Sequence, residues 1–243
     1  MAHFVLIHGA WHGSWCWEAI ATRLIAAGHV VSAPDLPCHG DDQSPIWAAT
    51  LGKYAKTALL SALSSSEPPL LVGHSLGGLV ITEAAARYPE RFAGLIYLCA
   101  FAPLPGDRLI HLARADRSGG VPAAVRQGLT RTSFQSSRAA EIFYHQCDPA
   151  AQAQAIARLR AEPNWPSFQK VSAPQGALPP RLYLECLEDR AISPSHQRWM
   201  RDRAGIEETI SIATDHSPFL STPDDLTTKL MEAAERLGRQ AER

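Results

Sequence analysis

The segment GHSLG at positions 73–77 sets one serine between two glycines, directly after the apolar run Leu70–Val72. The residues that follow, 79–88, have the composition of a helix. A G-x-S-x-G pattern between a strand and a helix is typical of a nucleophile elbow, a strained turn whose serine needs small neighbours. We therefore predict that Ser75 is a nucleophile. Without the flanking strand and helix, the same five residues would indicate an ordinary turn.

A serine is a poor nucleophile at neutral pH, so it needs a histidine base and a carboxylate that orients the base. After a G-x-S-x-G elbow, these partners follow in the order acid, then histidine. His216 lies in the loop after the last predicted strand, and we predict it as the base. Asp189 follows the apolar run at 181–186 and is the predicted acid. Glu188 and Asp215 are the alternatives.

Attack on a carbonyl also requires N–H donors for the oxyanion that forms. The residue after the nucleophile, Leu76, supplies one donor, and the loop HGAWHG after the first strand supplies the second, at Ala10. The same loop offers Gly9, Trp11 and His12 as residues that contact the substrate, although Trp11 is equally suited to packing against the rest of the chain. No phosphate-binding pattern of the G-x-G-x-x-G or G-K-[ST] type accompanies these glycines.

The elements that must position these residues follow from the apolar pattern. Strands with continuous rather than alternating apolarity are covered on both faces, as in a parallel sheet. Six such runs are at 4–7, 29–33, 70–73, 95–99, 181–186 and 208–212. Apolar residues at helical spacing lie between them, at 17–24, 51–59, 79–88 and 226–237. Alternating strands and helices predict an α/β fold with a mostly parallel, doubly wound sheet.

The alternation breaks between Pro103 and Pro180, where helical pieces at 123–129, 138–147 and 149–160 have no strand between them. We predict that residues 1–102 and 181–243 form the sheet-containing core, and that 103–180 is an all-helical cap over one edge of the sheet. Phe143 and Trp165 are candidate substrate contacts in the cap, or else part of its own small core. A Ser64–Ser66 loop is the single low-complexity fragment.

Composition narrows the partners. The chain has 243 residues and a net charge of −1, with no basic block that would attract nucleic acid or an anionic membrane. No apolar run approaches the roughly 20 residues that span a bilayer, and the N-terminus lacks a signal-peptide pattern. The five cysteines of the chain are scattered along the sequence, and this spacing favours neither disulfides nor a metal site. We expect a cytoplasmic monomer or homodimer, without a metal or cofactor, that acts on a small molecule.

Five segments carry a family resemblance: FVLIHGAWHGSWCW, APDLPCHG, VGHSLGG, ECLEDRAISPSHQRWM and TDHSPFLSTP. With these the chain resembles the α/β-hydrolase superfamily, in the branch of plant methylesterases and hydroxynitrile lyases with bacterial ester and carbamate hydrolases such as pyrethroid hydrolases. The resemblance covers nearly the whole chain, but the cap matches poorly. It implies Ser75, Asp189 and His216 as the catalytic triad and Ala10 with Leu76 as the oxyanion donors.

The resemblance leaves two other function classes open. Lyases of this branch have a threonine in the oxyanion loop and a lysine after the catalytic histidine, where this chain has Gly9 and Ser217. A receptor-like binding protein could keep the triad with little turnover. We predict a serine carboxylester hydrolase that forms an acyl-enzyme from small to medium hydrophobic or aromatic esters, and by extension from carbamates. An epoxide hydrolase or dehalogenase would need an aspartate at position 75.

Overall fold

A computed structural model describes residues 1–63 and 67–241, so the predicted Ser64–Ser66 loop lies outside the described residues. The main sheet has six strands in the order β2-β1-β3-β4-β8-β9, and every neighbouring pair is parallel. The strands are β1 (His3–Ile7), β2 (Val30–Ser32), β3 (Leu70–His74), β4 (Gly94–Leu98), β8 (Arg181–Cys186) and β9 (Glu208–Ile212). Each overlaps an apolar run in the sequence, which confirms the predicted α/β fold with a parallel sheet.

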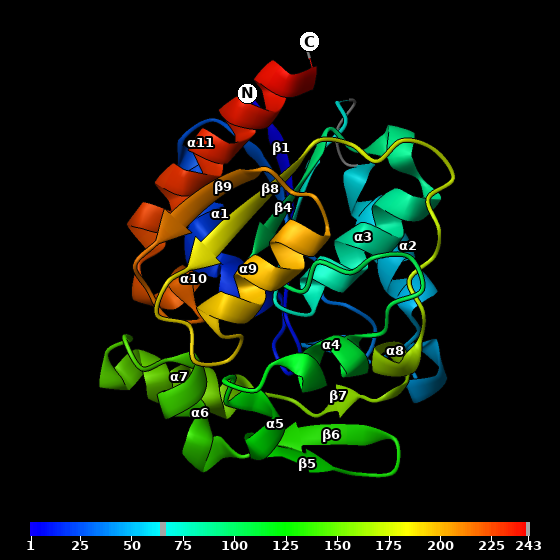
Figure 1. The fold of residues 1–243 in the computed structure, drawn as a ribbon. Helices are drawn as coiled ribbons and strands as arrows, with labels where there is room; N and C mark the ends of the chain where they lie inside the picture. Colours follow the sequence, from blue (N-terminus) through cyan, green and yellow to red (C-terminus); the bar gives the residue numbers. More distant parts are fainter. Residues whose placement is uncertain (64–66, 242–243) are drawn as a thin grey trace.

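Helices cover both faces of this sheet because the direction of the crossovers reverses after β2. Figure 1 shows α1 and α11 on one face and α2 and α3 on the other. Right-handed connections account for this split, since β1 to β2 runs one way and β3 to β4 the other. Outside the cap the helices are α1 (Glu18–Ala26), α2 (Leu51–Ala62), α3 (Gly77–Arg87), α9 (Pro194–Arg203), α10 (Pro218–Ser221) and α11 (Pro223–Ala241), with 3-10 turns at Ser14–Trp17, Ile46–Ala48 and Pro89–Arg91.

The core lies in the central strands. Every residue of β1, β3 and β4 is buried, because helices pack on both sides of them. In α11 the buried positions Leu226, Leu230, Ala233 and Leu237 repeat at intervals of three and four residues, so one face of that helix closes the sheet. The reversal of strand order at β1 and β3 places the carboxyl ends of these two strands at a switch point, where doubly wound sheets bind their ligands.

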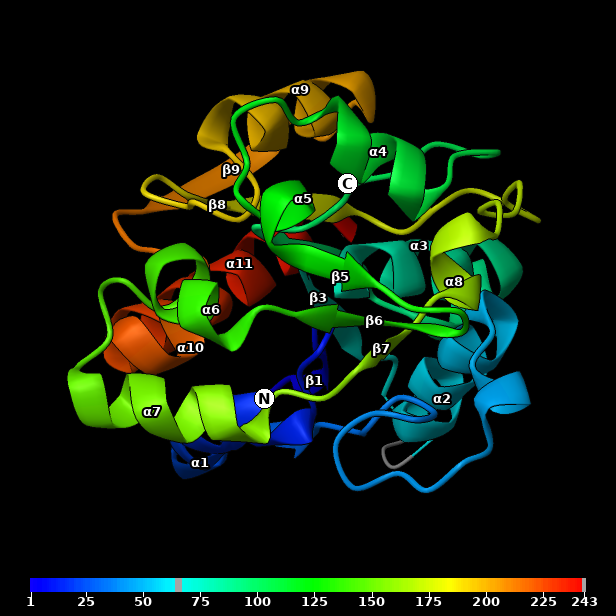
Figure 2. The same ribbon diagram turned by 90° about the horizontal axis from the view of Figure 1, so that it is seen from below.

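The predicted cap is residues 103–180. Its elements from α4 to α8 lie at the end of the sheet to which the strands point, and the residues after α8 run back beside α3 to the start of β8 (Figure 1). Figure 2, seen from that end, shows its elements spread across the sheet edge. They are α4 (Leu109–Ala115), α5 (Val121–Ala124), β5 (Val125–Gln127), β6 (Arg131–Phe134), α6 (Ser136–Phe143), α7 (Pro149–Arg158), β7 (Glu162–Pro163) and α8 (Trp165–Phe168).

The expectation of an all-helical cap is wrong. An antiparallel sheet in the order β5-β6-β7 occupies its centre, and β5 lies inside the segment predicted as helix at 123–129. The hairpin turns through residues 128–130, where the Gly128 N–H donates to the Arg131 carbonyl at 2.9 Å. Its strands are short and mostly polar, so they lack the apolar run that marked the buried strands. Pairing with β7, about 30 residues away, stabilises them.

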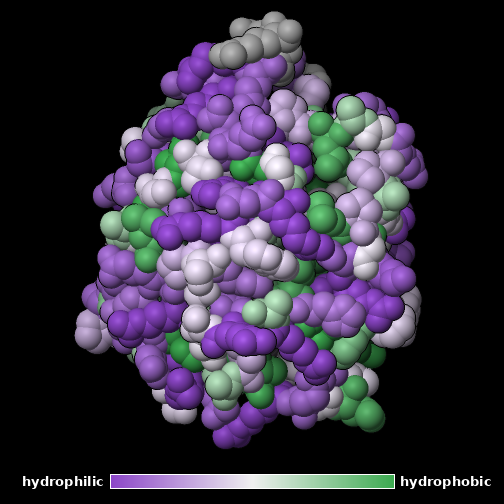
Figure 3. All heavy atoms as spheres, viewed as in Figure 1, coloured by the Kyte–Doolittle hydropathy of each residue, from purple (hydrophilic) through white to green (hydrophobic). Residues whose placement is uncertain are grey.

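Three further observations concern membrane-spanning helices, the cysteines and the surface. Among the described residues, no helix is long and apolar enough to cross a bilayer. The five cysteines are all buried thiols. The face shown in Figure 3 is mostly hydrophilic, with hydrophobic surface in separate small areas.

Candidate active site

Ser75 stands at the carboxyl end of β3 in a strained conformation. Its φ is 53°, in the left-handed region that residues other than glycine rarely adopt. The turn is held by the Ser75 carbonyl, which accepts from the N–H groups of Gly78 and Phe101, each at 3.1 Å. A Cβ on Gly73 would lie 2.5 Å from the Gly77 carbonyl oxygen, so a side chain there would push the turn open. The geometry is that of a nucleophile elbow.

His216 and Asp189 meet through a short hydrogen bond. His216 Nδ1 and Asp189 Oδ2 are 2.7 Å apart, and both residues are buried. The other carboxylate oxygen, Oδ1, accepts from the N–H groups of Ala191 and Ile192 at 2.7 and 3.0 Å. The Gln197 amide donates to Oδ2 at 3.0 Å. The three amide N–H groups all donate to this carboxylate, and His216 Nδ1 is placed to be a fourth donor to it.

The two rival carboxylates lie elsewhere. Glu188 is exposed at the surface of the loop after β8. Asp215 is buried, but its Oδ1 accepts from Ser217 N–H and the Ser221 hydroxyl, and its Oδ2 from Gln146 N–H. It therefore ties the His216 loop to the cap and does not bind the imidazole of His216. Of the three candidates, the fold brings Asp189 to His216.

The loop of His216 is fixed next to the elbow by His74, the residue before Ser75. His74 Nε2 donates to the His216 carbonyl at 2.9 Å, and the two ring centroids are 4.6 Å apart. The Cys99 thiol points to the same carbonyl at 3.6 Å. Burial lowers the pKa of His74 well below 6.5 and raises the pKa of Cys99 well above 9.0, so the imidazole is neutral and the thiol keeps its proton. Ligand atoms of His74, Cys99 and His216 lie within 4.8 Å, and these hydrogen bonds account for their clustering.

The two predicted oxyanion donors lie beside Ser75. Ala10, Ser75 and Leu76 line the same cavity of about 60 Å³. No hydrogen bond between described residues uses the N–H of Ala10 or of Leu76. Two unengaged N–H groups beside a serine hydroxyl can stabilise an anionic oxygen that forms there.

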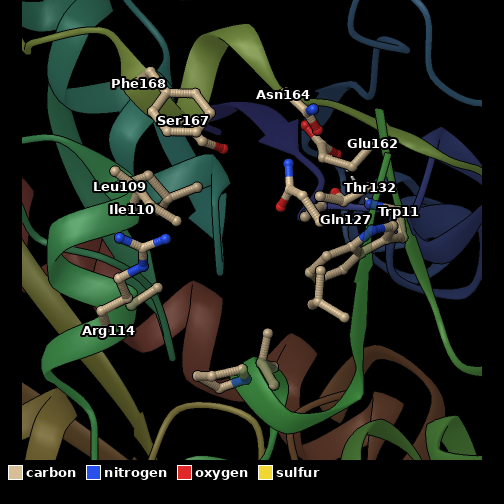
Figure 4. Close-up of a pocket in the computed structure, with 15 residues that line it drawn as sticks. Trp11, Leu109, Ile110, Arg114, Gln127, Thr132, Glu162, Asn164, Ser167 and Phe168 are labelled. Carbon is tan, nitrogen blue, oxygen red and sulfur yellow. Dashed lines mark hydrogen bonds between the residues drawn. The ribbon is translucent and has the colours of Figure 1, made fainter. Parts of the chain in front are cut away.

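The cavity beside Ser75 opens into a larger one of about 210 Å³. Ala10, Trp11, Leu109, Ala113, Val121 and Pro122 line both cavities. The walls near Ser75 are mainly apolar. Farther away, Gln127, Thr132, Glu162 and Asn164 lie together on one side, with Arg114 opposite them (Figure 4). The arrangement suits an apolar group close to the serine and a polar group at the far end.

The remaining candidates from the sequence occupy different places. Trp11 lines both cavities. Gly9 touches the elbow, since a Cβ there would lie 2.9 Å from Ser75 Cβ. His12 is buried, with Nε2 bonded to the Tyr144 hydroxyl at 2.7 Å and Nδ1 to the Ala10 carbonyl at 2.8 Å. Phe143 is buried and packs on the imidazole of His216, with ring centroids 5.6 Å apart. Neither His12 nor Phe143 lines the two cavities.

Trp165 is 60% exposed and lines an open hollow on the cap surface with Leu129 and Ile46, away from Ser75. Phe168, on the same short helix, lines both this hollow and the cavity of about 210 Å³. The apolar walls from α4 and α5 were not predicted as site residues. No motif marks them, because only the fold of the cap brings them over Ser75.

Comparison with known proteins agrees with this architecture. A family model described as the alpha/beta hydrolase family matches residues 4–228. Salicylic acid-binding protein 2 of Nicotiana tabacum is 32% identical over 256 positions, covering 96% of this chain and 97% of that protein. Methylesterase 1 of Arabidopsis thaliana is 30% identical over 256 positions, covering 96% of each. A pyrethroid hydrolase structure from Sphingobium faniae has a TM-score of 0.84 at 25% identity and covers 100% of this chain and 99% of that one.

The match runs through both the sheet and the cap, with nearly full coverage on each side. The chain belongs to the alpha/beta hydrolase family, in the esterase branch that includes the plant methylesterases.

Proposed function

We propose that the protein is a serine carboxylester hydrolase in which Ser75 is the nucleophile, His216 the general base and Asp189 the residue that orients His216. The observation that carries this proposal is the 2.7 Å bond from His216 Nδ1 to the buried Asp189 carboxylate, beside a serine in a strained elbow. With the proton on Nδ1, the Nε2 atom has a lone pair that can accept the proton of the serine hydroxyl.

The reaction then has two halves. Ser75 Oγ attacks the ester carbonyl while His216 Nε2 takes its proton, and the N–H groups of Ala10 and Leu76 stabilise the oxyanion. The intermediate collapses to the acyl-enzyme as the alcohol leaves with the proton from His216. Water then attacks the acyl-enzyme and gives its proton to His216, and Ser75 departs as the hydroxyl with that proton. No step needs a metal or an organic cofactor.

We assign small to medium hydrophobic or aromatic esters as substrates, with carbamates as a second class. The apolar walls near Ser75, from Leu109, Ala113, Val121 and Pro122, support this assignment. The names of relatives agree with it, since one is called a methylesterase and another a pyrethroid hydrolase. The two adjoining cavities leave room for a group larger than the methyl of a simple methyl ester.

A hydroxynitrile lyase-like reaction is the weaker candidate. A Cβ at position 9 would lie 2.8 Å from His74 Nδ1 and 2.9 Å from Ser75 Cβ, so this loop has no room for the threonine that lyases of this branch carry. The residue after His216 is Ser217, which is buried and uncharged and gives departing cyanide no cation.

A receptor-like protein with little turnover is the other alternative, and it is supported by the name of one relative, a salicylic acid-binding protein. One experiment separates the three. Purified protein is assayed with p-nitrophenyl and aryl methyl esters and with mandelonitrile, and Ser75→Ala is compared with Ser137→Ala, a control at an exposed position of α6.

We expect ester hydrolysis by wild type and by Ser137→Ala, and a loss of several powers of ten in Ser75→Ala, because covalent catalysis is removed. Equal rates in Ser75→Ala and wild type would refute the nucleophile assignment. Tight binding of a carboxylate product without ester turnover would favour the receptor-like alternative, and release of cyanide the lyase.

A further inference from the structure

Like Ser75, a residue in the loop after β1 has a left-handed backbone conformation at the candidate site. Trp11 has φ 61°, which a bulky aromatic residue does not adopt unless its surroundings enforce it. The peptide that joins Ala10 to Trp11 turns here, and the preceding N–H, that of Ala10, is the proposed oxyanion donor. Whatever fixes Trp11 therefore fixes the direction of that donor.

Apart from the Ala10 N–H, the polar backbone atoms of Ala10 and Trp11 all have partners. The Ala10 carbonyl accepts from His12 Nδ1 at 2.8 Å, and the Trp11 carbonyl accepts from Arg160 N–H at 2.9 Å. The Trp11 N–H donates to Glu162 Oε2 at 3.1 Å. Arg160 and Glu162 are cap residues about 150 positions away in sequence; Glu162 begins β7 and Arg160 lies two residues before it. The cap thus holds Trp11 from both its carbonyl and its N–H.

Glu162 is held in turn by His39. The carboxylate is 3% exposed, and its Oε2 lies 2.6 Å from His39 Nε2. The other ring nitrogen, Nδ1, faces the Pro37 carbonyl at 3.1 Å. Both partners of the imidazole are acceptors, and a neutral imidazole has a single N–H, so His39 must carry both protons. Burial lowers the pKa of His39, but the Glu162 carboxylate, the Pro37 carbonyl and Asp35 together raise that pKa above 6.5.

A buried ion pair of this kind is weak support for overall stability, since desolvation offsets much of its attraction. The ion pair instead orients the Trp11 N–H, because a charged carboxylate is a strong hydrogen-bond acceptor for it. Glu162 also lines the large cavity, so the residue that holds the loop would lie beside a substrate bound there.

We propose that Glu162 is a positioning residue for the oxyanion hole: supported by His39, it holds the Trp11 N–H and so sets the Ala10 N–H toward the developing oxyanion. This inference rests on the proposed esterase function. If Glu162 has this role, β7 must be packed against the loop after β1 for the enzyme to reach its full kcat, in addition to covering the substrate.

Glu162→Leu tests the proposal, because leucine has a similar volume and no acceptor. We expect kcat to fall by about 10- to 100-fold, less than the 10²–10³ typical of deleting an oxyanion donor outright, with KM within about threefold. Affinity for an aryl trifluoromethyl ketone, whose adduct with Ser75 carries an oxyanion, should fall by a similar factor. Glu162→Gln should restore most of both, since its amide oxygen can accept from Trp11. Glu141→Leu, at an exposed cap position, is the matched control.

If Glu162→Leu fails to fold, the double variant His39→Leu with Glu162→Leu takes its place, because it leaves no unpaired buried charge. The same loss of kcat is expected. A folded variant lacking the acceptor but with kcat and inhibitor affinity within threefold of wild type would overturn the proposal, as would a loss confined to KM. Failure of the esterase proposal itself looks different: wild type would then show no turnover that depends on Ser75.

Discussion

Replacing Asp189 by asparagine should lower kcat at neutral pH by about 10⁴-fold, equivalent to about 5.4 kcal/mol in transition-state stabilisation at 1.36 kcal/mol per factor of ten. In the wild type, the side-chain oxygens of Asp189 accept four hydrogen bonds, from the N–H groups of Ala191 and Ile192, the amide of Gln197 and the imidazole of His216. An asparagine keeps one acceptor oxygen and replaces the other with an NH₂ group.

The backbone donors decide which way that asparagine turns. The N–H groups of Ala191 and Ile192 cannot rotate, so the amide oxygen must face them and its NH₂ must face Gln197 and His216. Gln197 cannot turn its amide to suit, because its Oε1 accepts from Cys186 N–H and its Nε2 donates to the Cys186 and Ile192 carbonyls. His216 must then accept at Nδ1 and carry its proton on Nε2, which leaves no base for Ser75.

The assay is hydrolysis of a p-nitrophenyl ester by purified Asp189→Asn, with active sites counted by a fluorophosphonate label and folding checked by Tm. Glu188→Gln is the control, since Glu188 follows the same strand but is exposed, and kcat should stay within about twofold. Asp189→Asn within tenfold of wild type, or a comparable loss in Glu188→Gln, would refute the tautomer argument.

Three further outcomes are expected. Gly9→Ala should lower kcat more than tenfold, because its Cβ would meet His74 and Ser75, whereas Gly238→Ala, in α11 with open space around it, should leave kcat unchanged without lowering Tm. Phe168→Ala should shift the ratio of kcat/KM between a bulky aromatic ester and an acetate by roughly 1–3 kcal/mol, while Trp165→Ala, which lines neither of the two adjoining cavities, should leave that ratio unchanged. Burial lowers the pKa of His12 to about 4. Between pH 6.5 and 4, His12 is therefore protonated in the unfolded chain but stays neutral in the folded protein. Stability present above pH 6.5 should therefore be lost as the pH falls toward 4, and a Tm that stays constant over that window in wild type would contradict this reasoning.

Local patterns in the sequence were enough for the sheet and for the turn at Ser75. The runs at 70–73 and 95–99 overlap β3 and β4, whose residues are all buried, because strands covered on both faces are apolar along most of their length. The glycines around Ser75 predicted the turn for a similar local reason, because a strained turn with close backbone contacts has no space for a Cβ.

The cap could not be read in this way. Its strands β5 and β6 are short and polar. They pair with each other, and the third strand of their sheet, β7, comes from a distant part of the chain and pairs with β6. Phe143 and Trp165 have similar aromatic character in the sequence, yet one packs on His216 and the other lies 60% exposed on the surface. Apolar composition indicates that a side chain prefers burial, but not which neighbours will bury it.

The apolar runs and the glycines were enough to predict the α/β architecture, the elbow at Ser75 and a short list of partners for it. Which of Asp189, Glu188 and Asp215 contacts the His216 imidazole follows from the folded structure, because that hydrogen bond depends on how two loops pack and not on distance along the chain. The folded structure also brought Glu162 to Trp11 and His39, which no pattern had linked. Strands and tight turns are specified by sterics and burial over a few residues, whereas a site is specified by contacts between segments that meet only after the chain has folded.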